Sequence, residues 1–173
     1  MLKIAALVLA AASAASPPAL VSNAPWWEKV TVTVNSDGEP KACSYQTSLT
    51  PTKAKSCAVS GTSAALASES VGAASEITRI TFERRFTPTA EPGGGSIHPS
   101  ETLLGGQVMA LAIDSAGTVK GCKIVATSGD MTPDYGCKEA ATERFEASAG
   151  AKADHSREGF MTILVYGHAE HMV

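Results

Sequence analysis

Short stretches of alternating apolar and polar residues recur along this chain. Valine alternates with threonine over 30–34, and Met, Leu and Ile alternate with alanine over 109–113. Over 76–86, Ile80 and Phe82 lie in one phase, with charged or hydroxyl residues in the other. A period of two residues is typical of a β-strand with one buried face. The pattern therefore predicts three strands at these positions.

The strands predicted at 30–34 and 109–113 are followed by similar turn sequences, each with the pattern Ser-x-Gly. In both copies a glycine follows the strand, and glycine accepts the positive φ that a hairpin turn requires. A second strand with a cysteine comes next. Chance rarely reproduces a turn glycine and a cysteine at matched spacing, so we infer a duplicated unit. The aligned residues are Ser36, Gly38, Lys41 and Cys43 in one copy and Ser115, Gly117, Lys120 and Cys122 in the other.

A helix is predicted after each hairpin. Thr-Pro at 50–51 and again at 132–133 offers a hydroxyl N-cap and a proline at the first helical position, where no donor is lost. Asp134 adds a negative charge to the first turn, where the helix dipole favours it. Cys57 falls on the first helix. The residues that share one face of the second helix, and can pack on the sheet, are Cys137, Ala141 and Phe145.

The last predicted strand, Phe160 to Tyr166, is apolar on both faces. Such a strand is usually buried on both sides, so we expect it to meet the other copy or a second chain. Together the elements predict an α+β fold of two tandem units, each a three-stranded antiparallel sheet with one helix. The units span 26–90 and 105–173, with a Pro/Gly linker at 91–104 or, alternatively, a long loop between strands.

Four cysteines allow three disulfide pairings. The repeat favours Cys43 with Cys57 and Cys122 with Cys137, and each bridge would close a loop of about 15 residues and stabilise by roughly 3 kcal/mol. Neither pair has the C-x-x-C spacing of zinc or redox sites. We therefore predict two structural disulfides.

An export signal is predicted at the start of the sequence. Lys3 gives a positive start, 4–12 is an unbroken apolar run, and Ala12-Ser13-Ala14 has the small-x-small form of a cleavage site. The run is about half of the roughly 20 residues that a bilayer-spanning helix needs. We predict a signal peptide over 1–15, a periplasmic or secreted protein, and no stable membrane insertion after cleavage; a membrane anchor is the alternative.

Composition and motifs give no sign of catalysis. A net charge of −3 provides no basic field, so nucleic acid and acidic membranes are not expected partners. No G-x-S-x-G or H-E-x-x-H sequence occurs. We predict no enzyme, no catalytic residue, no cofactor and no metal site. His168 and His171 could bind a metal together, but a solvated chain end is favoured.

Three further groups of residues are of interest. Glu83, Arg84 and Arg85 are expected to face solvent. Two adjacent tryptophans on a strand point to opposite faces, so one of Trp26 and Trp27 should be buried and the other exposed. The pair at 144–145 is expected to place Phe145 in the core and Arg144 at the surface.

The second copy resembles the C-terminal domain of the TonB family, in its cysteine-bearing branch. The resemblance covers about 105–167 well and 26–90 loosely. TonB proteins are energy transducers whose terminal domain pairs with a strand of an outer-membrane receptor. The matching segments are the run from Val108 to Val119, Lys123 to Gly129, Asp134, Arg144-Phe145 and Phe160 to Val165.

The resemblance implies a protein-binding module that acts by edge-strand pairing. The chain lacks a long periplasm-crossing arm, so a complete energy transducer is not expected. The partner would be a protein or peptide strand, such as an envelope protein, or a second copy in a homodimer. The alternatives are an envelope enzyme or metal-binding protein with a site between the copies, or a structural homodimer. The expected partner-binding residues are Phe160, Ile163, Val165 and Tyr166.

Overall fold

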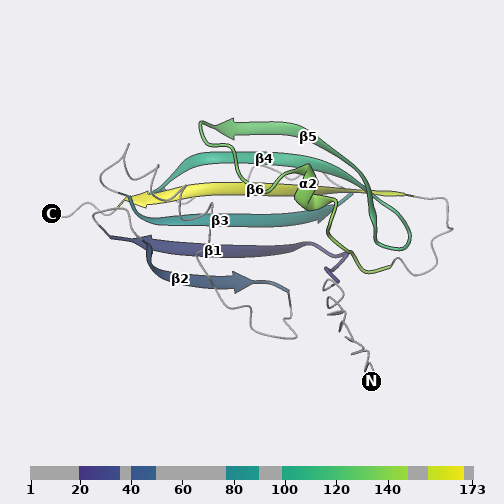
Figure 1. Cartoon of the computed structure of the whole chain (residues 1–173), viewed down its shortest axis with the longest axis horizontal. Helices are drawn as coiled ribbons and strands as arrows, with labels where there is room; N and C mark the ends of the chain where they lie inside the picture. The colour runs from purple at the N-terminus through teal and green to yellow at the C-terminus, as the bar shows by residue number, and fades with distance from the viewer. Residues whose placement is uncertain (1–19, 36–39, 50–76, 90–98, 148–155, 170–173) are drawn as a thin grey trace, which may run out of the picture.

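One six-stranded antiparallel sheet contains nearly all of the regular structure (Figure 1). The structure is a computed structural model that describes residues 20–35, 40–49, 77–89, 99–147 and 156–169. The strand order is β2-β1-β3-β6-β4-β5. The elements are β1 (Trp26–Val34), β2 (Pro40–Thr47), β3 (Ile77–Pro88), β4 (Glu101–Ile113), β5 (Val119–Gly129), α2 (Cys137–Ala140) and β6 (Arg157–Ala169).

The two predicted hairpins are both present, as β1–β2 and β4–β5. The duplicated cysteines hold equivalent places: Cys43 lies opposite Val32, and Cys122 lies opposite Leu111. In the second hairpin Gly117 has φ +82°, and a Cβ there would come within 1.9 Å of the Phe145 carbonyl oxygen. Only glycine fits this turn.

The prediction of two three-stranded units, each with its own helix, is wrong. The third strand of each half pairs with that of the other, because β6 lies between β3 and β4 and is antiparallel to both. An unpaired third strand would expose a row of backbone donors and acceptors in each half. Joining β3 to β6 satisfies both rows, so the halves form one continuous sheet.

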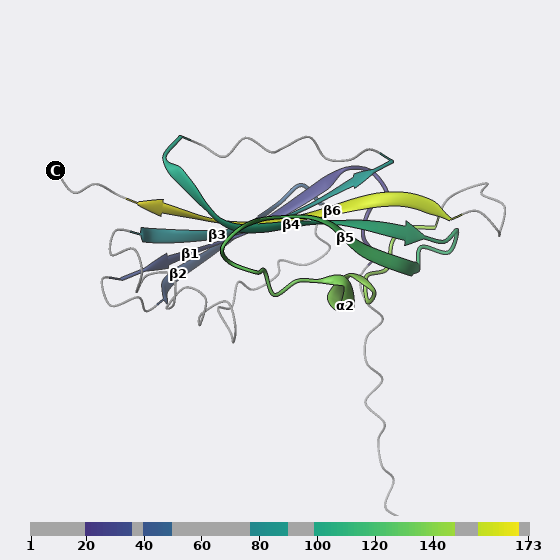
Figure 2. The same cartoon turned by 90° about the horizontal axis from the view of Figure 1, so that it is seen from above.

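The apolar core lies on one face of this sheet, called here the packed face. Seen from above, α2 and the chain leading to it lie on that side (Figure 2). Phe86 on β3 is at the centre of a buried ring cluster, 4.6 Å from Phe145 and 6.1 Å from Trp26 between ring centroids. The most deeply buried aliphatic residues of this face are Val32, Ile80, Met109, Leu111, Ile113, Met161 and Val165.

The second predicted helix is much shorter than expected. It does not begin at Thr132-Pro133 but at Cys137, where the Glu139 carboxylate accepts the N–H of Gly136 at 2.9 Å. The chain leaves the helix because the Phe145 N–H donates to the Gly117 carbonyl at 2.8 Å. The first predicted helix, at 50–51 and beyond, lies outside the described residues.

Two predictions about single side chains are confirmed. Trp26 is 3% exposed and packs in the core, whereas its neighbour Trp27 is 36% exposed. Phe145 is fully buried. It also forms a short parallel bridge with Val21, which ties the first described residues to the segment behind α2.

The predicted pairing of Cys122 with Cys137 is confirmed. The bridge joins β5 to α2 with a Cα–Cα distance of 5.5 Å. Cys43 is also disulfide-bonded, whereas Cys57 lies outside the described residues. Among the helices of the described ranges, none is long and apolar enough to cross a bilayer.

Replacing both Cys122 and Cys137 by alanine should lower the free energy of unfolding by about 3 kcal/mol, because the bridge closes a loop with a sequence separation of 15. Urea denaturation followed by circular dichroism measures this. Ala126→Ser, at an exposed position of β5, is the control and should change stability by less than about 0.5 kcal/mol. An unchanged midpoint in the double variant would contradict the stabilising role of the bridge.

Candidate functional site

The residues expected to bind a partner lie in the middle of the sheet. Phe160, Ile163, Val165 and Tyr166 belong to β6, whose backbone is paired to β3 on one side and β4 on the other. The side chains of Ile163 and Val165 lie on the packed face. Ile163 is 5% exposed and Val165 is 0% exposed. A further strand cannot add to a strand that is already paired on both sides. The open edges of the sheet must therefore be sought elsewhere.

The described sheet ends at β2 on one side and at β5 on the other. β2 has eight residues, starts at a proline and carries Lys41 beside it. A proline on an edge strand removes a backbone donor, and a shorter strand offers fewer unpaired backbone groups, so both features protect β2 from pairing with other chains. β5 has eleven residues and no proline. It is the less protected of the two edges.

The outer part of β5 is exposed over its last seven residues. Ile124 is 46% exposed and Val125 is 42% exposed. Across from them, the register with β4 shifts by one residue between Val108 and Met109, so Val125 is the extra residue of a β-bulge. A bulge places neighbouring side chains in unusual directions, and here two adjacent aliphatic residues reach the solvent.

The outer edge of β5 begins directly after a short contact between the chain and the segment that follows α2. Thr118 bridges Arg144 immediately before the strand begins. From Val119 to Gly129, β4 is the one strand of the described sheet that pairs with β5. The disulfide at Cys122 fixes the middle of β5 to α2, so this edge is held in place while no other described strand covers it.

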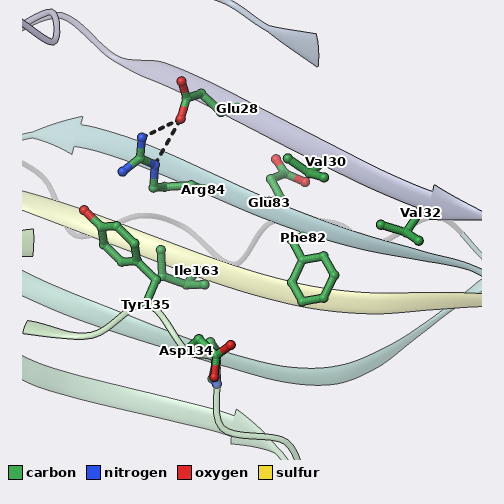
Figure 3. Close-up of a pocket in the computed structure, with 10 residues that line it drawn as sticks. Glu28, Val30, Val32, Phe82, Glu83, Arg84, Asp134, Tyr135 and Ile163 are labelled. Carbon is green, nitrogen blue, oxygen red and sulfur yellow. Dashed lines mark hydrogen bonds and ion pairs between the residues drawn. The ribbon is translucent and has the colours of Figure 1, made fainter. Parts of the chain in front are cut away.

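A buried charge network lies on the packed face, where the sequence pattern predicted exposed charges. Arg84 on β3 donates to the Glu28 carboxylate from Nε at 3.1 Å and from Nη2 at 2.5 Å, as Figure 3 shows. Arg84 also pairs with Glu143. Two tyrosine hydroxyls complete the network: Tyr45 donates to Glu28 at 2.6 Å, and Tyr135 donates to Glu143 at 2.7 Å.

The guanidinium of Arg84 is also held between two aromatic rings. Its central carbon lies 5.0 Å from the ring centroid of Trp26 and 5.0 Å from that of Tyr135, within the range of cation–π attraction. Burial disfavours the charge, but the carboxylates of Glu143 and Glu28 outweigh it and raise the pKa of Arg84. Burial and the bond to Glu28 raise the pKa of Tyr45 to about 12.

A groove runs over the packed face beside this network (Figure 3). Its volume of about 280 Å³ lies just below the ~300–1,000 Å³ that is usual for ligand pockets. The charged groups at its end already bind one another, so the groove offers mainly apolar contact. Its lining residues include Val30, Val32, Phe82, Ile163, Pro133 and Tyr135.

Glu83 is buried on the opposite face of the sheet, so the prediction that 83–85 faces solvent is wrong. Its side chain is 2% exposed, lies 3.4 Å from the Lys29 ammonium, and pairs with Arg85. The Tyr166 hydroxyl donates to it at 3.0 Å. Burial opposes the charge of this carboxylate, but Arg85 and Lys29 outweigh burial and lower the pKa of Glu83.

The sequence contains a signal for the Arg84 network in the phase of its charged residues. Glu28 is in phase with Val30 and Val32 on β1, and Arg84 is in phase with Phe82 and Phe86 on β3. Opposite charges that share the phase of the buried residues on two strands indicate an ion pair inside the core, because an unpaired charge there would be costly.

The histidines do not form a cluster in the part of the chain that the structure describes. His168 is half-buried at the end of β6, and His98, His155 and His171 lie outside the described residues. Within the described ranges, no group of three or more His, Cys, Asp or Glu side chains could hold a metal ion.

Comparison with protein-family models, with curated proteins and with solved structures finds no match to this chain. The resemblance to the TonB C-terminal domain therefore stays a prediction.

Replacing Arg84 by methionine should lower the free energy of unfolding by about 3 to 5 kcal/mol, since it leaves two carboxylates in the core without their shared cation. Arg79→Met is the matched control, because Arg79 is on the same strand and exposed; it should change stability by less than about 0.5 kcal/mol. Denaturant titration of both variants makes the comparison. Equal stabilities for the two variants would contradict the role given to Arg84.

Replacing Glu83 by glutamine should destabilise the protein by about 2 kcal/mol at pH 7 and by less at low pH. Because folding lowers the pKa of Glu83, its interactions stabilise fully above its ordinary pKa of 4.5 and are lost as the pH falls through the lowered value. Urea titrations at about pH 7 and pH 3 should show the gap between wild type and variant closing. A gap that persists at low pH would argue against the charged pairing.

Proposed function

We propose that this chain is an exported, non-catalytic protein-binding module that adds an extended strand of its partner to the open edge of β5. The observation that carries the proposal is the exposed half of β5, an eleven-residue strand with two exposed aliphatic side chains and, among the described strands, no neighbour on its outer edge. Main-chain hydrogen bonds along such an edge supply affinity, and side chains on alternate positions supply selectivity.

The disulfide framework supports the exported location of this proposal. Structural disulfides persist in oxidising compartments and are rare in the cytosol, and Cys122 is bonded to Cys137. The apolar run at 4–12 has the form of a secretory signal. A periplasmic or secreted protein fits both features.

The resemblance to the TonB C-terminal domain supports the same mode of action by a different route. The segment from Lys123 to Gly129, which carries part of that resemblance, forms the exposed half of β5. The proposal therefore keeps edge-strand pairing as the mechanism and moves it from β6, which is paired on both sides, to β5.

A synthetic peptide of alternating valine and threonine, as long as β5, tests the proposal. Titration into ¹⁵N-labelled protein should shift the amide signals of 119–129 most strongly and slow their hydrogen exchange, because the added strand pairs with their outward groups. The same peptide with N-methyl groups along one edge cannot form the ladder and should bind at least about tenfold more weakly, a loss of roughly 1.4 kcal/mol.

The control is the opposite edge. Amides of β2 should shift little, because β2 is the shorter edge strand and Pro40 has no N–H to donate. Shifts centred on β2 or on the groove of the packed face, with β5 unchanged, would contradict the proposal.

A further inference from the structure

β5 carries positive charge on a chain that is negative as a whole. The strand contains Lys120 and Lys123 and no acidic residue, whereas the net charge of the chain is −3. Lys120 lies 3.4 Å from Asp114 in the adjoining turn. Lys123 is exposed and forms no ion pair with another described residue. One cation on this edge is therefore available to a partner.

Lys123 stands next to the apolar part of the same edge. It immediately precedes Ile124 and Val125, the two exposed aliphatic residues of β5. A strand laid along β5 would place its side chains directly opposite these three, at the short distances of a β-ladder. Opposite charges and aliphatic pairs stabilise such cross-strand contacts, and like charges destabilise them.

We infer that the strand received by β5 is acidic, with glutamate or aspartate alternating with aliphatic residues. This inference rests on the proposed function and adds the chemistry of the partner. The acidic residues pair with Lys123, while the aliphatic residues at the alternate positions cover the exposed aliphatic side chains of β5.

A second copy of this chain fits the edge less well than an acidic strand. Two β5 strands side by side bring together two strands that each carry two lysines and no carboxylate. No cross-strand pair of opposite charge can form between them. The inferred partner is thus a different protein.

Three peptides of the length of β5 test the inference: valine alternating with glutamate, with threonine or with lysine. At low salt the glutamate peptide should bind about tenfold more tightly than the lysine peptide, because glutamate attracts Lys123 whereas lysine repels it. The difference should shrink in about 1 M salt, where exposed charges are screened. Fluorescence anisotropy of labelled peptides measures the affinities.

Lys123→Glu should weaken binding of the glutamate peptide about fivefold and strengthen binding of the lysine peptide. Lys41→Glu on β2 makes the same charge change on the other edge and should leave both affinities unchanged. Circular dichroism of each variant shows that it is folded.

The outcomes separate this inference from the function on which it rests. Equal binding of the three peptides at β5 would overturn the acidic partner and leave strand addition in place. Binding of none of them would overturn both. Sedimentation of the protein alone that showed a dimer, with the amides of β5 protected from exchange, would name a second copy as the occupant and overturn the inference.

Discussion

The pairing of β3 with β6 is the interaction on which the rest of the structure depends. It joins the two halves of a duplicated sequence at their third strands, in an antiparallel register that sets Phe82 opposite Val165 and Phe86 opposite Met161. Each half then continues outward through its own hairpin. Among the described strands, β2 and β5 are therefore the two with an unpaired edge, which is why the exposed end of β5 becomes the candidate for binding.

The same pairing explains why charged residues are buried near the centre of the sheet. Strand alternation sends Arg84 to the packed face and Glu83 to the other. Each meets partners from a neighbouring strand: Glu28 on β1 for Arg84, and Lys29 on β1 and Tyr166 on β6 for Glu83. Buried charges of this kind are costly unless paired, so they favour this one register over shifted ones.

Much of the local structure could be predicted from sequence, but whether the last strand pairs with the other copy or with a second chain could not. Alternation located the hairpins, and the repeat identified the Cys122–Cys137 bridge, because both depend on residues close in the chain. The helix predicted from Thr132 does not extend to Phe145, because Gly117 and Val21 hold residues 144–146 in an extended form. The prediction that β6 is a free edge strand was wrong for a related reason. Two strands with unpaired edges can pair within one chain or between chains. The outcome depends on contacts between residues that are distant in the sequence, so a local sequence pattern does not predict it.

The in-chain pairing of β3 with β6 is tested most directly by NMR on a sample that mixes ¹³C-labelled and unlabelled protein. A single continuous sheet predicts nuclear Overhauser contacts between Phe82 and Val165, and between Val165 and Gly105, all within one molecule. Contacts from β6 to β4 alone, or contacts to β3 that arise only between labelled and unlabelled molecules, would contradict a single continuous sheet.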